Sequence, residues 1–132
     1  MALPTRHLAL VSLVVPDYDA AIAFYVEGLG FALTQDTRLE GGKRWVTVSP
    51  GSGGADLLLA RAVGDAQRAA IGRQAGGRVW LFLHTDDFRR DRAAFKAAGA
   101  VFEEEARREA YGTVAVFRDP FGNRWDLIEP SP

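Results

Sequence analysis

The chain has 132 residues, of which 16 are Lys or Arg and 17 are Asp or Glu, so its formal net charge is −1. A near-neutral chain has no field that would capture nucleic acid or an anionic membrane surface. It contains no cysteine, which excludes disulfide frameworks, thiolate metal sites and thiol nucleophiles, and which fits a reducing cytoplasm. No apolar stretch approaches the roughly 18 residues of a membrane helix, and the first eight residues lack a signal-peptide pattern. We therefore expect a cytoplasmic protein.

The first half of the chain predicts one strand, one helix and three further strands. An apolar, β-branched run predicts a buried strand that ends at Pro16. Asp17 or Asp19 can cap the helix that follows, because a short carboxylate accepts hydrogen bonds from the free amides of the first turn. Gly28 and Gly30 close that helix. The predicted strands are residues 8–15, 31–38, 44–48 and 55–61.

The second half repeats this plan. Asp17 and Asp87, and likewise Asp56 and Asp126, are 70 residues apart (87 − 17 and 126 − 56). Asp86 or Asp87 caps the second helix, which Gly99 ends. The predicted strands here are residues 79–85, 101–107, 113–118 and 124–128. We therefore expect an α+β fold of two tandem βαβββ modules, at residues 8–62 and 79–130 of a single domain. A glycine- and alanine-rich connector, residues 63–78, joins them.

Such a doubled unit predicts two half-sheets with helices outside and the opposite faces curled around a cup-shaped cavity. Alternation along a strand assigns each residue to one of the two faces. The helix side should receive Leu13 and Leu83, together with Leu57, Leu59, Trp125 and Leu127 of the last strands. The cup should then be lined by Leu10, Ser12, Val14, Asp56, Leu58, Trp80, Phe82, His84 and Asp126, to which we add Phe117.

Several segments resemble one known family. They are the Asp17-Tyr18 helix start, the run Gly28-Leu29-Gly30-Phe31 and above all the segment 117–127, with its Asp119-Pro120-Phe121-Gly122-Asn123 turn. These are similar to the vicinal oxygen chelate (VOC) superfamily, which includes glyoxalase I, extradiol dioxygenases, fosfomycin-resistance transferases and bleomycin-binding proteins. The resemblance covers nearly the whole chain and implies the doubled βαβββ fold. It also implies a homodimer, which is common for family members of this size.

The resemblance further implies where a metal would bind. In metal-dependent relatives a His or Gln of the first strand and a Glu of the last strand hold the ion, and these positions map onto Leu10, Trp80, Asp56 and Asp126. Leu and Trp cannot bind a metal, and two carboxylates alone form an incomplete oxygen-only site. We therefore expect no cofactor. If a divalent ion is bound after all, Asp56 and Asp126 are the expected ligands.

Other side chains are candidates for contact with a small molecule. Asp126 and His84 are the candidate catalytic or anchoring groups, because burial raises the pKa of a carboxyl and histidine titrates near neutrality. The alternatives are that Asp126 hydrogen-bonds a neighbouring strand and that His84 is a strand-end residue. Trp80 offers a flat stacking surface. Arg108 and Tyr111 could clamp an anion at the cup mouth, or belong to a solvated loop.

Three functional hypotheses follow. The first, which we favour, is a metal-free protein that binds or processes a small, partly apolar molecule in the cup. The second is a metal-dependent lyase or isomerase resembling glyoxalase I, or a dioxygenase. The third is a non-catalytic interaction subunit whose cup is filled by its own side chains. The expected partners are a small molecule and a second copy of the chain, with no nucleic acid and no membrane.

Overall fold

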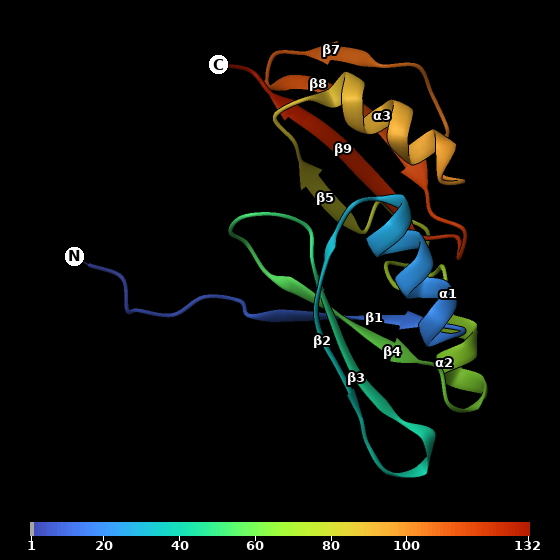
Figure 1. Cartoon of the computed structure of the whole chain (residues 1–132). Helices are drawn as coiled ribbons and strands as arrows, with labels where there is room; N and C mark the ends of the chain where they lie inside the picture. Colours follow the sequence, from blue (N-terminus) through green and yellow to red (C-terminus); the bar gives the residue numbers. More distant parts are fainter. Residues whose placement is uncertain (1) are drawn as a thin grey trace.

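The computed structural model describes residues 2–132, and its elements follow the predicted order (Figure 1). Each predicted strand is present within a few residues of its expected ends, apart from one that is divided in two. The first module contains β1 (Leu10–Val15), α1 (Tyr18–Ile22), β2 (Ala32–Arg38), β3 (Arg44–Ser49) and β4 (Asp56–Arg61). The second contains β5 (Leu81–His84), α3 (Phe88–Ala97), β6 (Val101–Phe102), β7 (Arg107–Glu109), β8 (Gly112–Arg118) and β9 (Arg124–Pro130).

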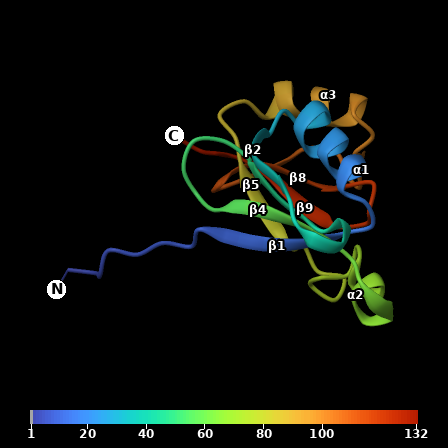
Figure 2. The same cartoon turned by 60° about the horizontal axis from the view of Figure 1, so that its bottom comes forward.

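The strands form two mixed sheets, which confirms the predicted α+β fold class. The first sheet has the order β1-β4-β3-β2, and the second has the order β5-β9-β8-β6, with β7 also paired to β8. In each sheet the first strand of the module runs parallel to its last strand, and the other pairs are antiparallel. α1 and α3 lie side by side against the sheets, whereas the connector helix α2 (Gly64–Ala70) lies apart from them (Figure 2). Within residues 2–132, no helix is both long and apolar enough to cross a membrane.

The helix starts settle two alternatives that the sequence left open. The Asp17 carboxylate accepts a hydrogen bond from the Ala20 amide at 2.8 Å, so Asp17 caps α1. The Asp87 carboxylate accepts from the Arg90 amide at 3.0 Å, so Asp87 caps α3. These short acidic side chains satisfy amides that have no partner inside the helix.

The first helix changes its winding where it meets the second module. After Ile22 it continues as a π-helix over Ala23–Gly28, a form with wider turns than the α-helix. This segment brings Gly28 against α3, where a Cβ on Gly28 would lie 2.8 Å from the Cβ of Ala98. The missing side chain at residue 28 therefore lets the two helices approach closely.

The predicted strand over residues 101–107 is divided into β6 and β7. The Glu103 amide still donates to the Val116 carbonyl, but the Val116 amide donates to the Glu104 carboxylate at 2.9 Å. A side chain thus replaces the next bond of the ladder and lets the backbone leave the sheet.

One continuous cluster of buried apolar side chains extends through both halves of the chain. Residues predicted to face the helices are confirmed there: Leu13, Leu59 and Leu127 are fully buried, and Leu57 and Trp125 nearly so. Aromatic rings form the middle of the cluster. The stacked pairs are Tyr25 with Phe31, at 6.0 Å between centroids, and Phe117 with Trp125, at 5.7 Å.

A buried carboxylate lies beside these rings. Asp119 accepts hydrogen bonds from the Trp125 indole at 3.0 Å, from the Asn123 side-chain amide at 2.9 Å and from the Tyr25 hydroxyl. Its second oxygen accepts from the backbone amides of Phe121 and Asn123, both at 3.0 Å. Five donors thus compensate one buried charge, and Tyr25 connects this second-module turn to the first module.

The connector is tied to the same network. The Gln74 side-chain amide donates to the Asn123 side-chain oxygen at 2.9 Å, and the Gln74 oxygen accepts from the Val14 amide of β1 at 2.8 Å. A chain of polar contacts therefore runs from β1 through the connector to the turn before β9.

This network predicts a pH dependence of stability. Burial and the neighbouring Asp119 raise the pKa of Tyr25 well above its usual value. The unfolded chain ionises Tyr25 near pH 10, whereas the folded chain keeps it protonated to higher pH, so its contribution is present below about pH 10 and is lost as the pH rises further. We expect the difference in unfolding free energy between the wild type and Tyr25→Phe to shrink above about pH 10. Urea unfolding of both proteins between pH 8 and pH 11 measures it, and a constant difference would contradict this assignment.

Candidate functional site

The strand register places the predicted cup residues on shared faces. In the first sheet Leu10 pairs with Asp56, and Ser12 pairs with Leu58. In the second sheet Phe82 pairs with Asp126. Val14 follows on the same face of β1 and is half-buried. These predicted lining residues are thus brought together, Leu10, Ser12, Val14, Asp56 and Leu58 in the first sheet and Phe82 and Asp126 in the second.

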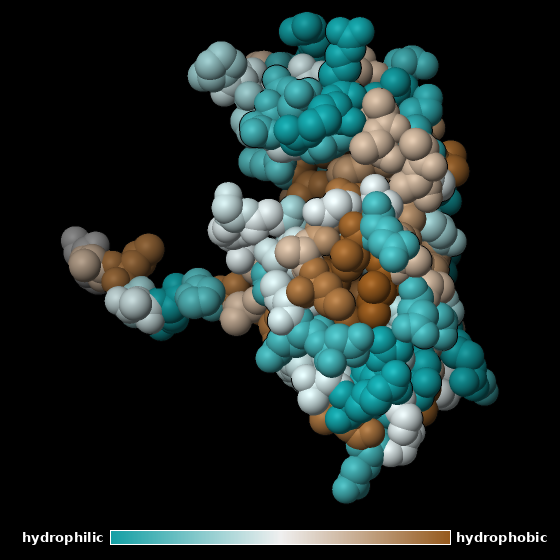
Figure 3. Space-filling model, in the orientation of Figure 1, coloured by the Kyte–Doolittle hydropathy of each residue, from teal (hydrophilic) through white to brown (hydrophobic). Residues whose placement is uncertain are grey.

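The two faces stay open within one chain. None of the strand pairs in residues 2–132 joins one sheet to the other. Leu10 is 39% exposed and Phe82 is 63% exposed, although both are apolar. Figure 3 shows a hydrophobic region across the middle of the molecule, between hydrophilic regions at its two ends.

Two aromatic residues lie elsewhere than the sequence predicted. Phe117 is fully buried in the core, because it pairs with Trp125 across β8 and β9 and therefore shares its helix-facing side. Trp80 precedes β5, is half-buried and packs against the core cluster. Neither residue lines the cavities described below.

Arg108 and Tyr111 lie at the exposed end of the second sheet. Arg108 belongs to β7 and pairs with Thr113, and the Tyr111 side chain is largely exposed. Both are absent from the linings of the two cavities.

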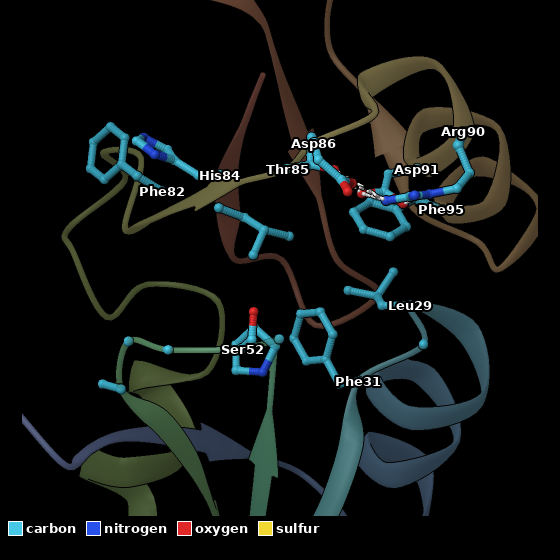
Figure 4. A pocket seen from close by; sticks show the side chains of 17 residues that line it. Leu29, Phe31, Ser52, Phe82, His84, Thr85, Asp86, Arg90, Asp91 and Phe95 are labelled. Atoms are coloured by element: carbon cyan, nitrogen blue, oxygen red, sulfur yellow. Dashed lines mark hydrogen bonds and ion pairs between the residues drawn. The ribbon is translucent and has the colours of Figure 1, made fainter. Parts of the chain in front are cut away.

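A cavity of about 840 Å³ lies between the modules (Figure 4). One wall is the loop at residues 50–55, and Phe82 and His84 project from β5 on the opposite side. Its size is within the range of small-molecule sites. Its larger apolar side chains are Leu29, Phe31, Phe82, Leu83 and Phe95.

The polar wall of this inter-module cavity is largely paired with itself. Arg90 binds Asp86 at 2.9 Å and Asp91 at 3.0 Å, and the Thr85 hydroxyl donates to Asp91 at 2.5 Å. These charges are therefore already compensated. The His84 side chain has no hydrogen bond or ion pair with the described residues, so its ring nitrogens are not engaged within this wall.

Sequence reasoning missed most of this lining. Of this lining the sequence predicts only Phe82 and His84 as site residues, and it offers Asp86 only as a possible helix cap. The sequence did contain one indication of this wall. Pro50 and Pro120 are also 70 residues apart (120 − 50), so the repeat makes the loop at 50–54 equivalent to the turn at 120–124. In the second-module turn Asn123 is buried and only Pro120 is exposed, whereas residues 51–54 are all exposed and line the cavity.

The next polar group of the candidate site is the Asp126 carboxylate, which lies beside Phe82 on the open face of the second sheet. Its Oδ1 is buried and has no hydrogen-bond partner among residues 2–132. Burial raises the pKa of its carboxyl; nearby Arg107 and Arg124 partly oppose this, and Glu104 adds to it. Both arginines are engaged elsewhere, Arg107 with Glu104 at 2.7 Å and Arg124 with Glu103 at 2.8 Å. A buried acceptor without a donor is costly, so a ligand that donates a hydrogen bond would be stabilised there.

Asp56 has a different environment. It is half-buried in the first sheet, and the Thr34 hydroxyl approaches its carboxylate at 3.5 Å, a weak contact. Asp56 and Asp126 thus belong to separate sheets.

The residues present do not fit the metal site that the resemblance implies. Leu10 stands directly across from Asp56 and supplies no donor atom. Throughout the described chain, no group of three or more His, Cys, Asp or Glu side chains could hold a metal ion. We therefore derive no chemical step through a metal.

Comparison with known proteins identifies the wider group. Residues 7–127 match the Glyoxalase/Bleomycin resistance protein/Dioxygenase superfamily. An uncharacterized protein of Shewanella frigidimarina (strain NCIMB 400) is 54% identical over 121 residues, which is 90% of either chain. The crystal structure of UcmS2 is similar with a TM-score of 0.80 and 30% identity, covering 96% of this chain and 99% of that one. TnmS3, an antibiotic binding protein from Streptomyces sp. CB03234, has a TM-score of 0.76 and 30% identity, with 98% and 100% covered.

Proposed function

The chain belongs to the Glyoxalase/Bleomycin resistance protein/Dioxygenase superfamily, and we propose that within it this protein binds a small, partly apolar molecule without a metal ion. The observation that carries the proposal is the pairing of Phe82 with Asp126. An exposed aromatic ring and a carboxylate oxygen that has no hydrogen-bond partner among residues 2–132 lie side by side on one sheet face. Such a pair suits a ligand with an apolar body and a hydrogen-bond donor.

The inter-module cavity supports the same proposal. Phe82 lines this cavity and pairs with Asp126 on the neighbouring strand, so a ligand that extends from the cavity past Phe82 would approach the carboxylate. TnmS3 is described as an antibiotic binding protein, and an antibiotic-like molecule is the class of ligand we propose here. The protein would then sequester this molecule in the cytoplasm, a location that the absence of cysteine permits.

We further propose that two copies pair as a homodimer. Leu10 and Phe82 leave apolar surface exposed on faces that the single chain does not cover. Burial of such surface in a second copy is favourable. Native mass spectrometry of protein purified without chelator reads subunit number, bound metal and retained small molecules in one spectrum. A stoichiometric metal would contradict the metal-free proposal and favour a lyase or dioxygenase activity.

Substitutions of Phe82 and of Asp126 test the proposed binding site. We expect Phe82→Ala to weaken binding of the neutral apolar dye N-phenyl-1-naphthylamine about tenfold, through loss of aromatic contact and buried area. Asp126→Asn should weaken the same binding severalfold and leave folding intact, because the buried Oδ1 of Asp126 has no hydrogen bond to lose within residues 2–132. Fluorescence titration measures the affinities.

The matched control is Val101→Ala. Val101 is 62% exposed, close to the exposure of Phe82, but lies on β6 and lines neither cavity. Its substitution should leave dye affinity unchanged. Equal affinities of the Phe82→Ala and Val101→Ala proteins would mean that Phe82 is not part of the binding site. A wild type that binds no dye would contradict the proposed function itself.

A further inference from the structure

The loop between β3 and β4, residues 50–54, forms one wall of the inter-module cavity, and residues 51–54 are all exposed. It lies across the cavity from Phe82 and His84 of β5 (Figure 4). β5 is an edge strand of the second sheet, and among the described residues no strand pair joins it to the first sheet. The loop can therefore move relative to β5 without breaking a pair of strands.

The repeat shows what holds the equivalent turn of the second module. Ser49 and Gly53 correspond to Asp119 and Asn123, since the members of each pair are 70 residues apart (119 − 49 and 123 − 53). The Asp119 carboxylate accepts from the amides of Phe121 and Asn123, both at 3.0 Å, and from the Asn123 side chain at 2.9 Å. The Asp119 amide donates to the Asn123 carbonyl at 3.0 Å. Asp119 and Asn123 are both buried, so this turn is fixed to the core.

The loop of the first module lacks these anchors. Ser49 replaces the carboxylate, and its hydroxyl donates to the Gly51 carbonyl at 2.9 Å. Gly53 has no side chain that could act as Asn123 does in the second module. Among residues 2–132, residues 50–54 take part in no backbone–backbone hydrogen bond. A segment with so few bonds changes conformation at low cost in free energy.

The same loop has space in which to move. A Cβ added at Gly51, Gly53 or Gly54 would meet no atom within 4 Å. The other walls of the cavity are fixed by comparison, because several of their apolar side chains belong to the buried core: Leu29, Phe31 and Phe95. The loop is thus the part of the cavity wall that can move on its own.

We propose that residues 50–54 form a lid that closes over a molecule bound in the inter-module cavity. The inference rests on the proposed function and adds a conformational step to it. Closure covers the apolar body of the ligand and excludes water from it, which favours the closed form when a ligand is present. In the free protein, ordering a glycine-rich loop loses conformational entropy without this gain, so the open form prevails. Release of the ligand then requires the loop to open first.

Stopped-flow mixing with an excess of N-phenyl-1-naphthylamine tests the lid. Binding in one step gives an observed rate that rises linearly with dye concentration, whereas closure after binding makes the observed rate approach a plateau. We expect a plateau for the wild type. Deletion of residues 52–54 should give a linear dependence and increase the dissociation rate of the dye about tenfold. The shortened connection, residues 49–51, 55 and 56, still lies between the paired Val48 and Leu57 and is long enough for a hairpin loop.

A label on the loop reports its movement directly. The chain has no cysteine, so Ser52→Cys provides a single attachment point for fluorescein. We expect the fluorescein signal to change on dye binding with the rate of the plateau. Ser131→Cys is the matched control, because Ser131 is also exposed but does not line the cavity. A label there should show no change.

A pair of glycine substitutions separates the lid from a general effect of alanine. Gly53 and Gly41 both have positive φ values, 87° and 69°, and a Cβ at either would meet no atom within 4 Å. Gly41, however, lines a second cavity, of about 470 Å³, near the other end of β3. Alanine narrows the range of backbone conformations that the loop can reach, so Gly53→Ala should lower the plateau rate severalfold. Gly41→Ala should leave this rate unchanged.

Three results would overturn the lid and leave the proposed function standing. They are a linear dependence in the wild type, a plateau that persists after deletion of residues 52–54, and a label at residue 52 that does not respond to bound dye. A wild type that binds no dye would overturn both proposals. Circular dichroism melting shows whether the shortened protein is folded. The Gly53→Ala and Ser52→Cys proteins keep the full loop length and decide the question if it is not.

Discussion

Asp119→Ala is expected to lower the free energy of unfolding by roughly 4 kcal/mol, because it leaves several buried hydrogen-bond donors without an acceptor. The Tyr25 hydroxyl, the Trp125 indole and the Asn123 side-chain amide all donate to this carboxylate from buried positions. Each buried donor left without an acceptor costs about 1–3 kcal/mol, and relaxation or entry of water recovers part of that sum. Urea unfolding followed by circular dichroism measures the loss.

The control for this prediction is an aspartate of the same charge without burial. Asp65 is fully exposed and forms one ion pair with Arg68 on α2. Its replacement by alanine should change stability by no more than about 0.5 kcal/mol. A loss of less than about 1 kcal/mol in Asp119→Ala would mean that the buried donors find other acceptors.

The sequence predicted the part of the fold that depends on local pattern. The 70-residue repeat and the alternation of apolar residues along the strands placed Leu13, Leu57 and Leu127 beneath the helices, where the structure has them. For each helix the sequence offered two candidate capping aspartates, because aspartates close together in sequence can accept from the same backbone amides. Strand alternation and helix caps depend on residues within a few positions of each other, and the repeat is visible as similarity between the two halves of the sequence, so one chain is enough to find them.

Long-range contacts were not predictable in the same way. The motif at 119–123 indicated a turn, but nothing in it shows that Asp119 meets a tyrosine 94 residues away. Phe117 was predicted to line the cup, and the sequence does not show the register between β8 and β9 that would have placed it elsewhere. Its pairing with Trp125 decides the side on which it lies.

The candidate site was predicted in part for the same reason. Phe82 and Asp126 could be placed on one face from parity alone, and their pairing across β5 and β9 agrees with that. Whether they contact a ligand stays a prediction. The inter-module cavity depends on how the two modules pack, and this is determined by contacts such as that of Gly28 with Ala98. Tertiary packing of this kind leaves little trace in a single sequence.

Gly72→Ala is the second substitution with a large expected effect, and it tests how the connector is held to the turn at 119–123. Gly72 has a positive φ of 74°, which costs a residue with a side chain about 1 kcal/mol. A Cβ there would also lie 2.4 Å from the Phe121 carbonyl oxygen and 3.1 Å from the Gly122 Cα. These neighbours are backbone atoms and cannot rotate away, so we expect a total loss of roughly 3 kcal/mol.

Gly76→Ala separates the two causes. Gly76 lies in the same connector with a similar φ of 65°, but a Cβ there would have no neighbour within 4 Å. It should therefore lose only about 1 kcal/mol, the cost of the backbone conformation alone. The difference between the two unfolding free energies measures the contact with the turn. Because this turn holds Asp119 and Asn123, and because Gln74 joins Asn123 to β1, Gly72→Ala should also weaken the coupling between modules. Equal losses in the two variants would show that the connector moves aside freely, and that the polar chain from β1 to Asp119 does not depend on close contact at Gly72.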